Sequence, residues 1–161
     1  MPGYTDDGRL YPQPDYRDWI YLSSGFDMSY TPRAAHAAGQ STFDNVFVNP
    51  EAYESFKQTG TWPDGTMLVL EVRRAENSAS INKSGYSQGH NVLGVELHVK
   101  DTARGGWAFY GFDGATPAKM LPKNADCYSC HRDHGAVDTT FVQFYPTLIP
   151  TAQQKHTFSM R

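Results

Sequence analysis

Short apolar runs, rich in branched and aromatic residues, alternate along the chain with polar stretches that contain glycine or proline. Runs of this length and composition are typical of β-strands bounded by turns. We therefore expect strands over residues 17–22, 44–48, 66–72, 91–100 and 107–112, and a last extended segment over 140–145 that ends before Pro146. The connections between neighbouring strands are short or polar, which favours antiparallel pairing.

The run over residues 91–100 separates its side chains by kind, because successive side chains of a strand point to opposite faces. One face carries the mixed set Val92, Gly94, Glu96 and His98. The other face carries the apolar set Leu93, Val95, Leu97 and Val99. The apolar set predicts the face that packs on the core.

Helix signals occur between and after the strands. Asn49 as cap, Pro50 in the first turn and Gly60 as terminator predict a helix that runs to about Thr59. A second helix is expected over residues 124–134, ending before Gly135. The segment 31–39 begins with Thr-Pro and ends with Gly, but it has few large apolar residues, so a short helix and a loop both remain open.

The remaining segments are polar or rich in turn residues. Residues 1–16 predict an irregular lead-in, residues 62–65 a turn, and residues 73–89 a long loop or a hairpin. The chain of 161 residues has no internal repeat and no break in composition, so we expect a single domain over residues 1–161. The expected fold class is α+β, mainly an antiparallel β-sheet with a few helices, of which the C-terminal one is residues 124–134.

Charge and hydropathy exclude several classes of partner. The formal net charge is −3, and the lysines and arginines are dispersed, so neither a nucleic acid nor an anionic membrane surface is expected as a partner. No stretch approaches the roughly 20 apolar residues that a membrane span needs. The chemistry of the chain must therefore be sought in a local motif.

That motif is Cys127-Tyr128-Ser129-Cys130-His131, which contains both cysteines of the chain. Cys-x-x-Cys-His is the attachment signature of a c-type haem. Two thiols three residues apart can form thioethers to the two haem vinyl groups, and the adjacent His131 can then ligate the iron. The aromatic content of 14% suits packing around a flat macrocycle.

Two other readings of the motif are weaker. A redox disulfide between Cys127 and Cys130 belongs after a strand in a thioredoxin-like βαβ unit, and no such pattern surrounds it. A zinc site could add His134, but structural zinc sites draw their ligands from two separated pairs, and the sequence has no second pair. Haem c is therefore the expected cofactor, one per chain.

Covalent attachment of haem in bacteria takes place outside the cytoplasm, so the motif predicts a periplasmic protein. No signal peptide is visible at the N-terminus. The periplasmic location thus rests on the motif, and the chain is expected to be the mature form of an exported protein.

The chain resembles the cytochrome P-460 family, which includes the cytochrome c′-beta proteins. The resemblance spans most of the chain, in the family's order. It is carried by YRDWI at 16–20, FDNVFVNPEAY at 43–53, GTWPDGTMLVLEV at 60–72, GVELHVKD at 94–101, GGWAFYGF at 105–112 and CYSCHRDHGAVDTTFVQFYPTL at 127–148. It implies an antiparallel sheet with one c-type haem, thioethers at Cys127 and Cys130, a five-coordinate iron on His131, and a homodimer.

One departure from the family pattern bears on function. Hydroxylamine-oxidising members carry a lysine on the strand equivalent to residues 66–72, and this lysine forms an extra bond to the haem macrocycle. The position is Leu70 here, and leucine has no nucleophilic nitrogen. The resemblance therefore shifts towards the cytochrome c′-beta type, which lacks the cross-link and binds diatomic gases beneath a hydrophobic cap.

The resemblance also suggests residues of the distal side. Leu70 is expected against the haem, with Phe43 and Phe47 as candidates for the cap or, equally, as ordinary core residues. Asp138 is a candidate catalytic carboxylate, with a loop or cap residue as the alternative. Glu96 and Glu71 are further strand carboxylates, and Glu71 should point away from the face of Leu70.

No sixth iron ligand is assigned from the sequence. The candidates are His36, His90, His98, His134, His156, Met28, Met67 and Met120. For each histidine, a surface or hydrogen-bonded role is the alternative. His134 lies three residues after His131, so the two cannot reach opposite faces of one haem.

These observations predict a periplasmic mono-haem cytochrome that binds NO, and CO, at a five-coordinate iron. An apolar distal side favours these ligands over O₂, which gains most from a hydrogen-bond donor. Two alternatives stay open. One is an oxidoreductase acting on hydroxylamine or a similar small nitrogen species. The other is a simple electron-transfer cytochrome with a redox partner protein.

Overall fold

The computed structural model describes residues 1–29, 41–77 and 80–160. Its centre is one five-stranded sheet in the order β1-β2-β3-β4-β5, with every neighbouring pair antiparallel. The strands are β1 (Ile20–Phe26), β2 (Thr42–Val48), β3 (Met67–Asn77), β4 (Tyr86–Asp101) and β5 (Gly106–Phe112). Each strand thus pairs with the strand that precedes it along the chain. The expected α+β class with an antiparallel sheet is confirmed.

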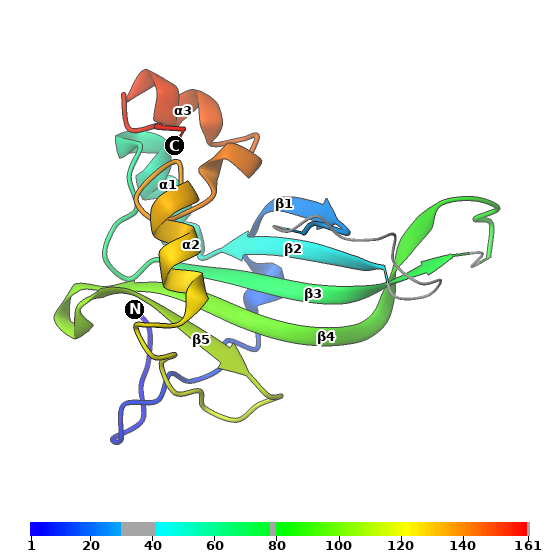
Figure 1. Cartoon of the computed structure of the whole chain (residues 1–161), viewed down its shortest axis with the longest axis horizontal. Helices are drawn as coiled ribbons and strands as arrows, with labels where there is room; N and C mark the ends of the chain where they lie inside the picture. Colours follow the sequence, from blue (N-terminus) through cyan, green and yellow to red (C-terminus); the bar gives the residue numbers. More distant parts are fainter. Residues whose placement is uncertain (30–40, 78–79, 161) are drawn as a thin grey trace.

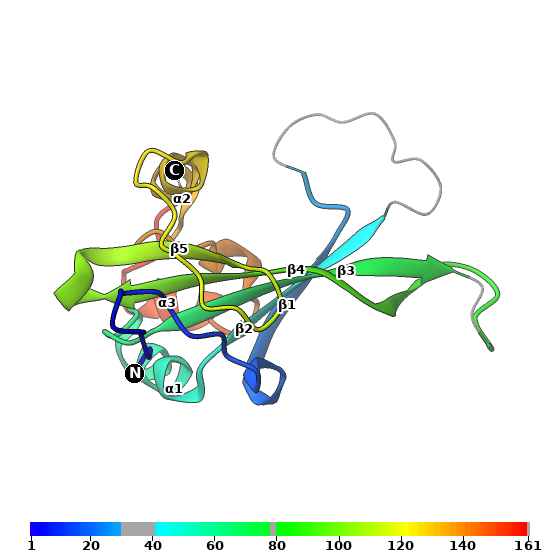
Figure 2. The same cartoon turned by 90° about the horizontal axis from the view of Figure 1, so that it is seen from below.

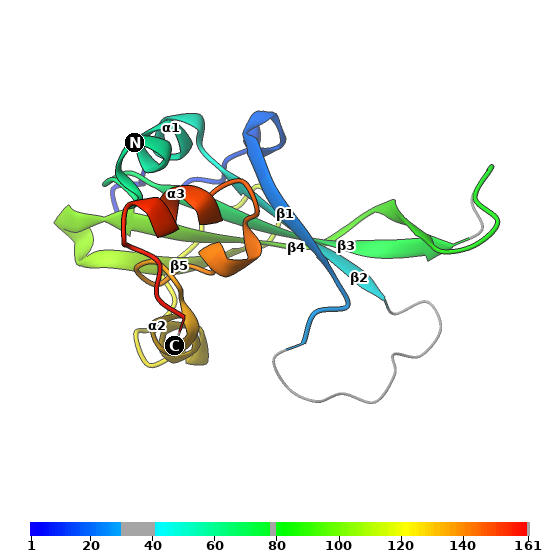
Figure 3. The ribbon, with the colours of Figure 1, turned by 90° about the horizontal axis from the view of Figure 1, so that it is seen from above.

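The helices gather at one end of the sheet, where both termini also lie, and the hairpin of β3 and β4 projects from the other end (Figure 1). The views from below and from above also show this hairpin extending away from the helices (Figures 2 and 3). The helices are α1 (Pro50–Thr59), α2 (Asp126–His134) and α3 (Ile149–Gln154), with short 3-10 turns at Tyr16–Asp18, Thr102–Arg104 and Val142–Phe144. No helix in the described part of the chain is long and apolar enough to cross a membrane.

Helix α1 begins and ends as the sequence predicts, but Asn49, the expected cap before it, makes a different contact. Pro50 lies in the first turn, and Gly60 ends the helix in the left-handed conformation with a φ of 75°. Asn49 makes no side-chain cap bond. Its Oδ1 instead accepts a hydrogen bond of 2.8 Å from the backbone N–H of Met67. The asparagine therefore joins the start of α1 to the start of β3.

The expected extended segment over residues 140–145 is wrong. Val142–Phe144 form a 3-10 turn, and α3 follows after Pro146. The buried residues of this region are Phe141, Val142, Tyr145, Leu148 and Ala152. Their spacing of three to four residues is that of a helical face, and the branched and aromatic composition concealed it. Helix α2 is consequently not the last helix of the chain.

Two apolar clusters cover the two faces of the sheet. One contains Leu10, Phe47, Met67, Val69, Leu97, Val99, Ala108, Tyr110 and Ala118. The other joins the sheet residues Leu22, Val48 and Leu68 to Ala52 and Phe56 of α1, Trp62, and the C-terminal residues Val137, Val142, Tyr145, Leu148 and Ala152. Both faces are therefore packed at the helical end of the sheet.

The predicted core face of residues 91–100 is confirmed only where the sheet is covered. Leu97 and Val99 are buried in the first cluster. Leu93 is 46% exposed because it lies towards the projecting hairpin. The mixed face is not a solvent face either, since His98 is only 6% exposed. The side chains opposite Leu97 and Val99 therefore belong to a second interior.

A buried carboxylate lies on the face of β3 opposite Leu70. Glu71 is fully buried and accepts hydrogen bonds from Arg73 Nε at 2.7 Å, Arg17 Nη1 at 2.6 Å, Asn45 Nδ2 at 3.1 Å and the Tyr16 hydroxyl. Burial alone would raise the pKa of Glu71, but these donors outweigh it and lower the pKa from 4.5 to about 2. This network ties the segment before β1 to the centre of the sheet.

Candidate functional site

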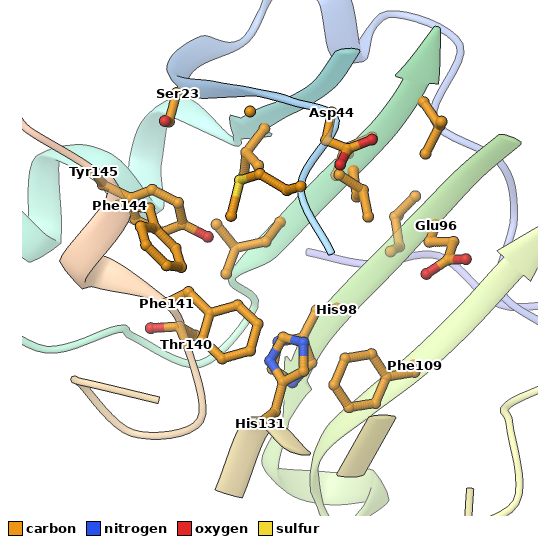
Figure 4. Close-up of a pocket in the computed structure, with 18 of the residues that line it drawn as sticks. Ser23, Asp44, Glu96, His98, Phe109, His131, Thr140, Phe141, Phe144 and Tyr145 are labelled. Carbon is orange, nitrogen blue, oxygen red and sulfur yellow. The ribbon is translucent and has the colours of Figure 1, made fainter. Parts of the chain in front are cut away.

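A cavity of about 600 Å³ lies between the sheet and the segment that follows α2. The sheet provides Asp44 and Val46 from β2, Leu68, Val69, Leu70 and Val72 from β3, Glu96, Leu97 and His98 from β4, and Phe109 from β5. The opposite wall is His131, Thr140, Phe141, Phe144 and Tyr145 (Figure 4). This volume is within the range of about 300–1,000 Å³ that is usual for cofactor pockets, and the lining is mainly apolar, as theirs is.

Helix α2 brings Cys127, Cys130 and His131 to one face. Residues three and four apart lie above one another on a helix, so Cys127 shares its face with both others. Both cysteines are half-buried and free. The exposed residues of α2 are Asp126, Ser129, Arg132, Asp133 and His134. The two thiols and the histidine thus lie on the less exposed side of the helix, and of the three only His131 lines the pocket.

The imidazole of His131 is held in one tautomer. Its Nδ1 lies 2.7 Å from the carbonyl oxygen of Thr139. A carbonyl can only accept, so Nδ1 carries the proton and Nε2 keeps its lone pair. Burial lowers the pKa of His131, and its hydrogen bond to the Thr139 carbonyl acts in the opposite direction. A neutral imidazole with a free Nε2 is the form that ligates a metal.

Aromatic rings surround His131. The ring centroid of His131 lies 4.1 Å from that of Phe141, 4.7 Å from that of Phe109 and 4.8 Å from that of His98. Figure 4 shows these four rings meeting at the base of the pocket. These contacts cover much of the ring, which is partly buried, and restrict its orientation.

Gly135 brings the Thr139 carbonyl close to α2. A Cβ at Gly135 would lie 2.6 Å from the His131 carbonyl oxygen and 2.9 Å from both the Thr139 carbonyl carbon and the Thr140 nitrogen. These neighbours are backbone atoms, so they cannot swing away. The absence of a side chain at residue 135 is thus part of how Thr139 reaches His131.

Among the described histidines considered as a sixth ligand, His98 lines the pocket, but it lies beside His131. The two rings are in contact, which leaves no space for a flat macrocycle between them. His98 therefore does not lie across a haem from His131. Burial, followed by the charges of His131 and Lys123, lowers the pKa of His98 well below its usual value, so its ring is neutral.

The other sixth-ligand candidates divide by position. Met28 lines the pocket, whereas Met67 is buried on the opposite face of the sheet. The exposed candidates are Met120, His90, His134 and His156. His36 lies outside the described residues. Among the described residues, no group of three or more His, Cys, Asp or Glu side chains converges as a protein-only metal site.

Leu70 and the two phenylalanines lie on different faces of the sheet. Leu70 lines the pocket together with Val46, its partner across β2 and β3. Phe47 lies on the opposite face in the core, with its ring centroid 5.6 Å from that of Tyr16. Phe43 shares the face of Phe47 by strand alternation and contacts Phe26 at 5.0 Å. Of the two alternatives, cap or ordinary core residue, Phe47 takes the core position, and neither phenylalanine lines the pocket.

Asp138 also lies away from the pocket. Its Oδ2 accepts a hydrogen bond of 3.2 Å from Lys100 Nζ. Asp138 has a φ of 52°, and Val137 and Thr140 form a bridge on either side of it. The turn that aims the Thr139 carbonyl at His131 thus aims the Asp138 side chain elsewhere. Of the two alternatives for Asp138, its position in a turn outside the pocket lining is that of the loop residue.

Two carboxylates on the strands do lie in the pocket. Asp44 and Glu96 both line the pocket, on either side of β3. Asp44 pairs with Val72, and Glu96 pairs with Leu70. Burial, reinforced by Asp27 and Glu96, raises the pKa of Asp44. Sequence reasoning considered Glu96 but missed Asp44, which strand alternation from Val46 would have placed on the same face.

Comparison with known proteins identifies the domain that contains this site. No curated protein matches the chain. The family model described as Cytochrome P460 matches residues 13–142, which contain all five strands, the cysteine pair and His131. This match covers most of the chain and ends just after the turn that holds His131. A neutral histidine beside two thiols, facing an apolar pocket, is thus part of a recognised haem-binding domain, and the chain belongs to the cytochrome P460 family.

Proposed function

We propose that this protein is a mono-haem c-type cytochrome that binds NO, and also CO, at an iron with an open distal position. Cys127 and Cys130 would hold the haem by thioethers, and His131 would ligate the iron through Nε2. The observation that carries the proposal is the hydrogen bond from His131 Nδ1 to the Thr139 carbonyl at the base of an apolar pocket. Haem, when bound, supplies the iron that takes the gas ligand.

The residues of the pocket fit this group. Cys127, Cys130 and His131 share one face of α2, and the cavity of about 600 Å³ opens directly against the ring of His131. Phe109 and Phe141 flank the histidine and cover part of its ring. The strand residues Val46, Leu70 and Val72 provide an apolar wall for a flat ring.

The same wall supports selection of NO and CO. Bound O₂ gains most from a hydrogen-bond donor beside it, whereas NO and CO bind ferrous haem well without one. The charged residues of the described lining are Asp44 and Glu96, and an ionised carboxylate can only accept hydrogen bonds. The ionised carboxylates and the apolar side chains Val46, Leu70 and Val72 therefore offer no donor to bound O₂.

The test is the absorption spectrum of the haem-loaded protein, ferric and dithionite-reduced, before and after addition of NO and CO. We expect a high-spin five-coordinate spectrum that changes with each gas, and a main band without a strong red shift. A low-spin spectrum that neither gas alters would refute gas binding and indicate electron transfer. A strongly red-shifted main band would indicate a bond to the macrocycle despite Leu70.

An oxidoreductase acting on hydroxylamine or a related small nitrogen species is the second candidate. The observation that favours it is the pair Asp44 and Glu96, since a carboxylate in the pocket could accept protons from a bound nitrogen ligand. Steady-state turnover of hydroxylamine with a dye acceptor tests it. Turnover well above that of free haem, lowered 10²-fold or more in Glu96→Gln or Asp44→Asn, would support the enzyme, and turnover equal to that of free haem would exclude it.

We further propose a periplasmic location, because covalent haem attachment in bacteria takes place outside the cytoplasm.

We also propose a homodimer, as the family resemblance implies. Apolar side chains remain exposed towards the projecting hairpin, among them Phe26, Ile81, Tyr86, Val92 and Leu93. A second copy could cover them, as exposed apolar patches often mark interfaces. The mass of the haem-loaded protein in solution tests the dimer, and a monomer at micromolar concentration would exclude it.

A further inference from the structure

A second hydrogen bond stands behind the one that holds His131. The Oγ1 of Thr139 lies 3.3 Å from Nε2 of His98, while the carbonyl of the same threonine accepts from His131 Nδ1 at 2.7 Å. His98 comes from β4, 41 residues away from Thr139. Thr139 thus connects the sheet to the imidazole on α2.

The ring of His98 is fixed in place. It is stacked on Phe109 with a centroid distance of 4.0 Å and an interplanar angle of 7°, and the ring centroid of Trp107 lies at 4.3 Å. Nδ1 of His98 has no hydrogen-bond partner among the described residues, so Nε2 is the nitrogen that is anchored. A phenyl ring would fill the same stack but could not make the bond to Thr139.

We propose that His98 is a positioning residue, which holds Thr139 and thereby sets the strength of the hydrogen bond between His131 and the Thr139 carbonyl. This inference rests on the proposed function, because it concerns how strongly His131 donates electrons to a haem iron. Partners of this kind orient a metal-bound histidine and raise its basicity.

The expected consequence is electronic. A firm bond from Nδ1–H to the Thr139 carbonyl gives His131 more negative character, which strengthens its bond to iron and stabilises the ferric state. When Thr139 is no longer held, that bond weakens. The iron–histidine bond then weakens with it, and the ferrous state gains relative to the ferric state.

Three variants of the haem-loaded protein test the proposal: His98→Phe, Thr139→Val and the double variant. His98→Phe keeps the aromatic stack, and Thr139→Val keeps the carbonyl. We expect each to shift the ferric–ferrous equilibrium towards ferrous by up to tenfold, which is about 59 mV for a one-electron couple. The iron–histidine stretching frequency in the Raman spectrum of the ferrous protein should fall in each. The double variant should equal the single ones, because both remove the same bond.

Trp107→Phe is the matched control. It alters the stack on His98 without touching the bond to Thr139, so the potential and the stretching frequency should stay at the wild-type values. If His98→Phe does not fold, Thr139→Val alone decides. Unchanged potentials and frequencies in the variants, or fully additive effects, would overturn the proposal. A wild-type protein that carries no covalent haem would instead refute the proposed function itself, and this inference with it.

Discussion

Replacing both Cys127 and Cys130 by serine is expected to abolish covalent attachment of haem. The two thiols lie on the face of α2 that also carries His131, and a serine hydroxyl does not form the thioether that a thiolate forms. The wild-type polypeptide should keep one haem after denaturation, and the double variant should keep none. Mass spectrometry of the denatured protein measures this directly. Each single variant should retain one of the two thioethers.

Ser129→Ala is the control for this prediction. Ser129 lies between the cysteines but is exposed, and within the described residues its hydroxyl bonds to the Asp126 carbonyl in the same helix, at 2.9 Å. Its removal should leave the haem content unchanged. A double cysteine variant whose denatured mass still includes haem would show that some other side chain attaches it.

Replacing Glu71 by alanine is expected to lower the free energy of unfolding by about 3–5 kcal/mol, because it breaks a buried ion pair and leaves positive charge without its partner. Arg73, at 2.7 Å, is mostly buried, whereas Arg17 is half-exposed and contributes less. Urea unfolding measures the loss. Glu54→Ala is the control, since its exposed pair with Lys57 should contribute no more than about 0.5 kcal/mol. A loss below about 1 kcal/mol for Glu71→Ala would contradict the prediction.

The same carboxylate makes stability depend on acid. Because the pKa of Glu71 is lowered from 4.5 to about 2 in the folded protein, its contribution is present above pH 4.5 and is lost as the pH falls to about 2. A shift of this size corresponds to roughly 3 kcal/mol. The difference in stability between the wild type and Glu71→Gln should therefore shrink across this window. A difference that stays constant with pH would exclude Glu71 as the group responsible.

The elements that local rules describe well were the ones predicted from the sequence. Strand alternation gave the buried pair Leu97 and Val99, and Pro50 with Gly60 marked the ends of α1. The strand prediction for residues 140–145 was wrong because branched and aromatic side chains favour strands. The buried side chains of this region are instead spaced three to four residues apart, which is a helical spacing. The correct period was present in Phe141, Tyr145 and Leu148, but composition outweighed it.

The two walls of the pocket differ in how far the sequence could predict them. Cys127, Cys130 and His131 are close in sequence, so one helix suffices to bring them together. The sheet wall depends on the register between strands, which places Val46 opposite Leu70 and Leu70 opposite Glu96. Without that register, Phe43 and Phe47 could not be assigned to the far face. The role of His98 needed a contact across 41 residues, for which no local pattern exists.

The strand order along the sheet also determines the order in which the pocket can be assembled. Each strand pairs with its predecessor, and all five precede Cys127 in the chain. Pairings between neighbours in sequence form quickly, because little chain entropy is lost in bringing them together. We therefore expect the sheet wall to be complete while the cysteine segment is still undocked and accessible. The haem, once bonded to the cysteines of α2, would then dock onto a sheet that has already formed. Haem attachment and closure of the pocket would thus be a single late step of folding.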